Sequence, residues 1–296
     1  MSGHSPARSE ESGPLCIGLD VGTSGVKLAV VSTSRSDGVL FSCEKEIRYC
    51  VSKEGFRVQN AADILDVVKH LLESVPAHLQ CRVRRLGVAG QMHGCVQWSK
   101  HGVCSDLVTW EDQRCSKRFL DSVFDKTGHR LHSGYGGATL SWFAAEKQDA
   151  FVNIVGCGTI MDFVVESLVR LPESTKSFGV ACMDVTNAAS WGLFDPQKRS
   201  WDPDALQKLG IPTSIMPQIV DIGSDVRRVR GQTSLQSLFN LQEGETVVDV
   251  YVAVCAICMR VRCAVAIPTS ADQCLCRLVT TQRPCFRLPR QVKLKD

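Results

Sequence analysis

Residues 17–28 read Ile-Gly-Leu-Asp-Val-Gly-Thr-Ser-Gly-Val-Lys-Leu, two apolar runs joined by a turn of small residues. The runs Cys16–Val21 and Val26–Ser32 predict the two strands of a β-hairpin. Asp20 closes the first run, Lys27 lies in the second, and the turn between them consists of Gly22, Thr23, Ser24 and Gly25. Small turn residues let backbone N–H groups approach anionic oxygens, while the acid can hold a hydrated Mg²⁺ ion and the lysine adds positive charge. The stretch therefore predicts a phosphate-binding turn of a nucleotide-dependent phosphotransferase; the alternative is a hairpin without a ligand.

The residues that follow predict a mixed α/β sheet flanked by helices. Residues 39–51 are expected to add a third strand, and Val83–Ala89 forms a short buried strand. Between them, residues 60–75 begin with an Asn cap and carry apolar side chains at helical spacing. Further helices are expected at 113–126, 139–149, 158–170 and 203–209, the last begun by Asp202-Pro203. This order fits an α/β layer with the phosphate turn at one end of the sheet.

Composition indicates an ordinary globular protein. Of 296 residues, 44% are hydrophobic and 22% are charged, which is enough to bury a sizeable core. The 34 basic and 31 acidic residues nearly balance, so we expect neither a nucleic-acid partner nor a membrane surface. Residues 1–14 lack the apolar segment of a secretory signal and are expected to form a disordered lead. We therefore expect a cytoplasmic protein whose 15 cysteines are reduced and mostly belong to the core.

Polar residues follow the predicted strand Val83–Ala89 directly, in the run Gly90-Gln91-Met92-His93-Gly94. Sheets of this type bind ligands at strand ends, and the neutral donors and acceptors of Gln91 and His93 suit a polyol. The alternative is a glycine-flanked turn with a structural histidine.

A second candidate ligand segment is Val108-Thr-Trp-Glu-Asp-Gln-Arg114. The flat face of Trp110 can pack on sugar C–H groups, and the carboxylates of Glu111 and Asp112 can bind hydroxyls. In the alternative, Trp110 ends a buried strand and Asp112 caps the following helix. Asp162 and Asp184 also lie beside small polar residues; we interpret them first as cap and turn residues and second as substrate contacts.

The C-terminal region differs in texture from the rest. Residues 251–296 contain six cysteines, eight Arg or Lys and two acidic residues, without a clear period after Met259. A zinc cluster is one interpretation of Cys255, Cys258, Cys263, Cys274, Cys276 and Cys285. Only one Cys-x₂-Cys pair occurs, within an apolar run that suits burial better.

Six runs in order across residues 15–240 resemble the FGGY carbohydrate kinase family: IGLDVGTSGVKLAV, GVAGQMHG, LVTWEDQRC, GTIMDFVV, NAASWGLFD and IPTSIMPQIVDIGS. The resemblance implies a ribonuclease-H-like (actin-like ATPase) fold and phosphoryl transfer from MgATP to the terminal hydroxyl of a ketose. It implies that Asp20 orients Mg²⁺, that the turn Gly22-Thr23-Ser24 binds phosphate and that Lys27 neutralises charge on the transferred group. Met92 and His93 would line the sugar site, with Trp110 and Asp112 nearby.

The chain departs from that family near Val248. The family places a Gly-Asp-x-Gln segment at a strand end soon after the equivalent of Gly244, and its Asp is the general base. Asp249 lacks the preceding Gly and the following Gln, so we assign no catalytic residue. We expect residues 15–248 to form the family's N-terminal domain and 249–296 to be a divergent tail outside the native fold. We also expect the family's second domain, with its adenine pocket, to be absent. The chain would then be a truncated form; the alternative function is an inactive fragment or sugar-binding module.

Overall fold

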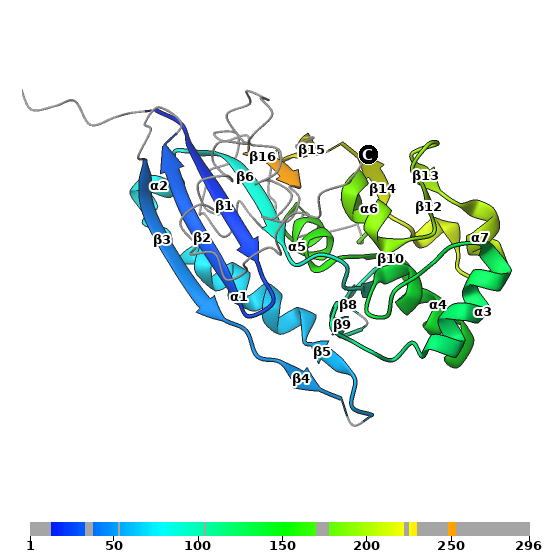
Figure 1. Cartoon of the computed structure of the whole chain (residues 1–296). Helices are drawn as coiled ribbons and strands as arrows, with labels where there is room; N and C mark the ends of the chain where they lie inside the picture. The colour runs from blue at the N-terminus through cyan, green and yellow to red at the C-terminus, as the bar shows by residue number, and fades with distance from the viewer. Residues whose placement is uncertain are drawn as a thin grey trace, which may run out of the picture.

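The computed structural model describes residues 13–32, 38–52, 54–103, 105–169 and 178–221, and the backbone of 225–229 and 248–252. A long twisted sheet lies beside a part that is mainly helical (Figure 1). Within these ranges, none of the helices combines the length and apolar character needed to cross a membrane.

The predicted hairpin forms two neighbouring inner strands of the sheet. Strand β1 (Leu15–Val21) pairs antiparallel with β2 (Gly25–Ser32), and Val21 lies opposite Val26 at the turn. Strand β3 (Val39–Glu46) continues the antiparallel meander, whereas β6 (Val83–Gly90) pairs with β1 in parallel. The sheet is therefore mixed, as the sequence predicts.

The third predicted strand is wrong in its extent. Residues 39–51 do not form one strand, because β3 ends at Glu46 opposite Gly25, where β2 has no further residue to pair with. The chain then leaves the sheet, and β4 (Cys50–Val51) pairs instead with β5 (Arg57–Gln59).

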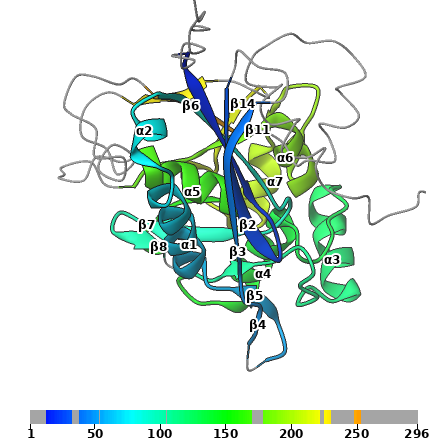
Figure 2. The ribbon, with the colours of Figure 1, turned by 90° about the vertical axis from the view of Figure 1, so that its left-hand side faces the viewer.

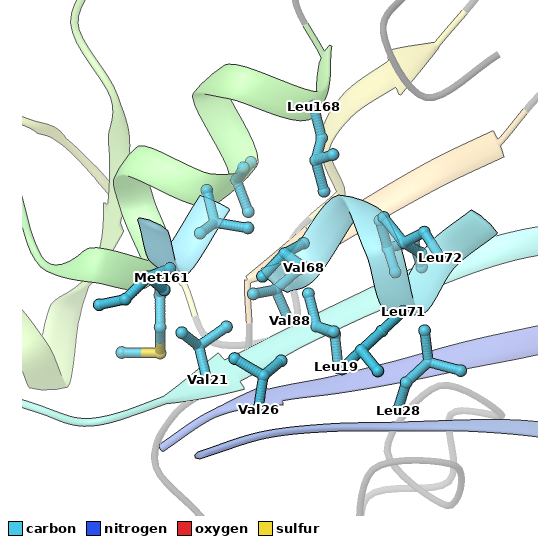
Figure 3. Packing of buried hydrophobic residues seen from close by; sticks show 14 of the residues in the cluster. Leu19, Val21, Val26, Leu28, Val68, Leu71, Leu72, Val88, Met161 and Leu168 are labelled. Atoms are coloured by element: carbon cyan, nitrogen blue, oxygen red, sulfur yellow. The ribbon is translucent and has the colours of Figure 1, made fainter. Parts of the chain in front are cut away.

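Two helices pack on one face of this sheet, α1 (Ala61–Glu73) and α5 (Ile160–Val169). Figure 2 shows both helices on the same side of the strands. Helix α1 begins as predicted, because the Asn60 side chain accepts hydrogen bonds from two N–H groups of its first turn. Alternate side chains of the strands, such as Leu19 and Leu28, point toward these helices and form the larger core (Figure 3).

A second core surrounds the fully buried Trp191. Its helices are α3 (Lys117–Thr127), α4 (Gly136–Glu146), α6 (Val185–Trp191) and α7 (Pro203–Lys208). The predicted helices are confirmed with shifted ends, but α6 is a helix that the sequence did not predict. The start at Asp202-Pro203 is confirmed, since the Asp202 side chain caps α7.

Short elements complete the described chain. The strands among them are β7 (Val96–Ser99), β8 (Gly102–Val103), β9 (Leu107–Val108), β10 (Ile154–Gly158), β11 (Cys182–Asp184), β12 (Phe194–Asp195), β13 (Ser200–Trp201), β14 (Gln218–Val220), β15 (Asp225–Val229) and β16 (Val248–Val252). The two short helices are α2 (Ala77–Gln80) and η1 (Thr213–Ile215).

Strand β16 bears on the predicted domain boundary at residue 248. Its backbone pairs in parallel with β6 and antiparallel with β15, so the six-stranded sheet has the order β15-β16-β6-β1-β2-β3. The boundary thus falls at the first residue of a strand of the central sheet. The cysteines considered for zinc, from Cys255 onward, lie outside the described residues.

Candidate functional site

The turn between β1 and β2, residues 22–25, is called the phosphate turn below. Its backbone is closed by the Gly22 N–H, which donates to the Gly25 carbonyl at 3.0 Å. That N–H is therefore committed within the turn, although the sequence assigned it to a phosphate. Among the described residues, the N–H groups of Thr23 and Ser24 have no hydrogen-bond acceptor, and Ser24 is exposed. An anion would be bound by these two groups at the tip.

Asp20 and Lys27 face each other across the hairpin, where the register pairs them directly. Burial raises the pKa of the Asp20 carboxyl, and the charge of Lys27 opposes that rise. The Lys27 ammonium is half exposed and lies 3.8 Å from a Glu44 carboxylate oxygen. Such an exposed pair is weak, so Lys27 is available to a more strongly charged anion. Asp20 suits a hydrated Mg²⁺ ion, which binds one or two carboxylates and keeps its waters.

Residues 91–94, called the histidine loop below, follow β6 at the same edge of the sheet. The Gln91 N–H donates to the Val21 carbonyl at 2.9 Å, so the loop begins beside the end of β1. Gly90 is required there, because a Cβ would lie 2.5 Å from that carbonyl oxygen. The predicted loop at a strand end is thus confirmed, with Gln91 buried and Met92 half-buried.

His93 has a positive φ of 72°, a strained conformation for a residue with a side chain. Two contacts stabilise it: the ring stacks on Tyr135 with centroids 3.9 Å apart, and Nδ1 lies 3.1 Å from the Ser190 hydroxyl. That hydroxyl donates its proton to the Asn187 carbonyl, so Nδ1–H is the donor to Ser190 and Nε2 is an acceptor. Burial, followed by the charge of His132, lowers the pKa of His93. A neutral His93 can therefore accept a hydrogen bond from a hydroxyl.

Trp110 lies beside the phosphate turn, since its indole Nε1–H donates to the Thr23 hydroxyl oxygen at 3.2 Å. Its side chain is 41% exposed, which leaves part of the ring free to pack on a ligand. Gly134 supports the segment, because a Cβ there would lie 2.4 Å from the Trp110 carbonyl oxygen.

Asp112 forms a buried ion pair with Arg114 and does not cap a helix. The next helix, α3, is capped by Ser116, so the predicted cap is wrong. Both Asp112 oxygens accept from the Arg114 guanidinium, and they also accept the N–H groups of Arg57 and Arg114. The carboxylate is fully buried. Its hydrogen bonds fix the segment that carries Trp110.

Gln59 connects the phosphate turn to the histidine loop. Its Nε2 donates to the Thr23 carbonyl at 2.8 Å, and its Oε1 accepts from Gln91 Nε2 at 2.9 Å. The two segments that the sequence predicted for phosphate and polyol therefore meet at one edge of the sheet.

Asp162 and Asp184 have the cap and turn roles predicted for them. Asp184 caps α6 by accepting from the N–H groups of Thr186 and Asn187. Asp162 accepts from both the N–H and the hydroxyl of Thr159, and burial raises its pKa to about 7.

Asp249 lies away from this edge. Its backbone pairs with Arg85, whereas Asp20 pairs with Ala89, four residues further along β6. Four residues of a strand span about 13 Å. The position supports leaving Asp249 without a catalytic role. Among the described residues no group of three or more His, Cys, Asp or Glu is placed to bind a metal.

The sequence did not identify Gln59, Tyr135 or Ser190. Gln59 is a single amide before a helix cap, and Ser190 lies in a helix that was not predicted. The run Gly134-Tyr-Gly-Gly137 was a usable signal for Tyr135, because glycines on both sides of an aromatic ring allow close backbone approach.

A family model and curated relatives both match this chain to carbohydrate kinases. Residues 15–239 match the N-terminal domain of the FGGY family of carbohydrate kinases. Sedoheptulokinase of Mus musculus is 33% identical over 261 residues, which cover 80% of this chain and 52% of the relative. Human sedoheptulokinase is 33% identical over 248 residues, 75% of this chain and 50% of the relative. The chain thus spans about half the length of the curated relatives it matches.

Solved structures show the same fold. A xylulose kinase from Rhodospirillum rubrum has a TM-score of 0.66 at 18% identity and covers 86% of this chain and 51% of its own. A Plasmodium falciparum glycerol kinase with ADP has a TM-score of 0.65 at 16% identity, covering 84% and 51%. The predicted actin-like sugar-kinase fold is confirmed.

Proposed function

The chain belongs to the FGGY family of carbohydrate kinases, and on that premise we propose that it functions in the transfer of the ATP γ-phosphate to a ketose. The proposed substrate is sedoheptulose, giving sedoheptulose 7-phosphate. Its support is the likeness to two sedoheptulokinases, which exceeds 30% identity over three quarters or more of the chain.

The observation that carries the proposal is the meeting of the phosphate turn and the histidine loop. Phosphoryl transfer has little covalent work for the protein to do, so positioning and electrostatic stabilisation provide most of the catalysis. A phosphate turn that Gln59 joins by hydrogen bonds to a segment suited to polyols is the arrangement that such positioning needs.

The geometry of the turn supports the following proposed roles at the nucleotide side. ATP, when bound, supplies the phosphoryl group and its Mg²⁺. The N–H groups of Thr23 and Ser24 bind phosphate oxygens, Lys27 adds charge, and Asp20 orients the hydrated ion. Gly22 acts by closing the turn.

At the sugar side, Nε2 of neutral His93 accepts a hydrogen bond from a sugar hydroxyl. The Trp110 ring packs on the carbon skeleton of the sugar. Gln91 offers its Oε1 to a further hydroxyl, and Met92 lines the site. The buried Asp112 carboxylate positions Trp110 by accepting the backbone N–H groups of Arg57 and Arg114.

The test measures ADP formation by the 296-residue chain with Mg²⁺, ATP and sedoheptulose, with xylulose and glycerol as competing acceptors. Turnover that favours sedoheptulose supports the proposal, and Asp20→Asn is expected to remove it. The matched control is Asp66→Asn, because Asp66 is an exposed carboxylate of α1 that pairs, within the described residues, with Lys69 of the same helix. Preference for another acceptor would contradict the proposed substrate.

A second candidate function is a chain that binds the ketose without turnover. The position of Asp249 favours it: this residue pairs with Arg85, away from the histidine loop, and so is not placed to act as a general base on a bound ketose. Calorimetric binding of sedoheptulose that is weakened by His93→Ala, without ADP formation, would support this candidate over the kinase. Absence of both binding and turnover would contradict both.

A further inference from the structure

Gln59 is completely buried at the junction of the two halves of the proposed site. It ends β5, a three-residue strand, and Asn60 immediately after it caps α1. Strand β5 also pairs with β9, where Gln59 lies opposite Leu107, and the chain from β9 leads to Trp110. The residue is therefore fixed by a helix start and by a neighbouring strand.

The chemistry of the carboxamide fixes its direction. The Thr23 carbonyl can only accept a hydrogen bond, so the NH₂ group of Gln59 faces the phosphate turn. The Gln59 oxygen then faces Gln91 and accepts from the Gln91 NH₂ group. Consequently Gln91 has its own orientation fixed, with NH₂ toward Gln59 and Oε1 free.

Gln91 Oε1 is buried and has no hydrogen-bond partner among the described residues. A buried acceptor without a partner is costly, and a donor hydroxyl at that position would relieve the cost. The orientation set by the Thr23 carbonyl thus determines that Gln91 presents an acceptor, not a donor.

We propose that Gln59 is a positioning residue that sets the phosphate turn and the histidine loop in one fixed relation and orients Gln91 to accept a substrate hydroxyl. The inference rests on the proposed function, which assigns ligands to the two segments. Gln59 lies under both segments and acts through Thr23 and Gln91.

The first test compares amide hydrogen exchange of residues 22–25 and 91–94 in the full chain and in Gln59→Met. The variant keeps the volume and removes both hydrogen bonds, so exchange in both segments should accelerate about two- to tenfold. The matched control is Gln80→Met, because Gln80 is also buried and its Nε2 donates to the Val75 carbonyl at 2.9 Å. If Gln59→Met accelerates amide exchange in the two segments no more than Gln80→Met does, the positioning role is wrong.

A conservative variant separates the two bonds. In Gln59→Glu, a protonated carboxyl can donate to Thr23 and accept from Gln91, whereas the ionised form can only accept. Protection of the phosphate turn should match the parent chain at low pH and fall as pH rises, while the histidine loop keeps its protection. Protection of the turn that does not vary with pH beyond the parent's own profile would overturn the assigned direction.

The third measurement is the calorimetric affinity of sedoheptulose and of MgADP for the parent chain, Gln59→Met and Gln80→Met. Both affinities should weaken about two- to tenfold in Gln59→Met and stay unchanged in Gln80→Met. Unchanged affinities in Gln59→Met would overturn the proposal. If the parent chain binds neither ligand, the proposed function fails, and the exchange experiment still decides whether Gln59 positions the two segments.

Discussion

The phosphate turn and the histidine loop lie at the same edge of the sheet, but different ranges of sequence determine them. The turn is closed by its own Gly22–Gly25 hydrogen bond and by the register of the flanking strands. The loop depends on Tyr135 and Ser190, which are 42 and 97 residues away along the chain. A hairpin turn closes by local pairing, whereas a strained histidine needs packing from distant elements.

Further support for the loop comes from β9 and from the segment that follows it. The Cys95 N–H, directly after the loop, donates to the Val108 carbonyl at 2.9 Å. The Asp112–Arg114 ion pair then fixes the end of that segment. Changes at Tyr135 or Ser190 should therefore disturb the histidine loop before the phosphate turn.

The largest effect is expected for Arg114→Met. Removing the guanidinium leaves the fully buried Asp112 carboxylate without its counter-charge, so the free energy of unfolding should fall by about 3–5 kcal/mol. Urea unfolding followed by circular dichroism measures it. The double variant Asp112→Asn/Arg114→Met should recover part of the loss; equal losses in the single and double variants would contradict the ion-pair explanation.

The second effect concerns Asp162, in the first turn of the helix whose Met161 packs beside Gly90. Burial raises its pKa to about 7 from an ordinary value of 3.8. The folded state thus retains a proton that the unfolded chain releases, and stability falls as pH rises from about 4 to 7, by at most about 1.4 kcal/mol per pH unit.

Urea unfolding across this pH range in the parent chain and in Asp162→Asn measures the effect. The variant has no titrating carboxyl at this position, so its stability should fall less steeply with pH. Identical pH profiles for the two chains would show that Asp162 is not the source.

The third effect compares two glycines directly. In Gly90→Ala the new Cβ would lie 2.5 Å from the Val21 carbonyl oxygen, so a loss of about 1–3 kcal/mol is expected. In Gly22→Ala the nearest atom is the Gly25 carbonyl oxygen at 3.2 Å, and the loss should be smaller. Thermal unfolding measures both. A larger loss in Gly22→Ala would reverse the view that the histidine loop is the more tightly packed segment.

The smallest effect is expected for Tyr135→Leu. Loss of the stacked ring should cost about 0.5–1.5 kcal/mol. Opening the site to water should also raise the pKa of His93 toward its ordinary value of 6.5, because burial is the main cause of its depression. NMR titration of the His93 ring measures the pKa. Tyr135→Phe keeps the ring and should leave the pKa unchanged; a matching shift in Tyr135→Phe would implicate the hydroxyl.

Many of the segments that form the candidate site were predictable from local sequence patterns. Strand-like runs around a turn of small residues indicated the hairpin, and polar residues after a buried strand indicated the loop. Short-range rules failed where pairing partners decided the outcome. Residues 39–51 form two strands because β2 ends, and Asp112 binds Arg114 while Ser116 takes the cap.

The sequence by itself determined the hairpin, its turn, the cap of α1 and the family, because these depend on residues close together in the chain or on runs in order. Only the tertiary structure decided that Gln59 joins the turn to the loop and that Tyr135 and Ser190 fix His93. Those contacts join elements 32 to 97 residues apart, and hydrogen bonds over such separations form only once the sheet brings strand ends together.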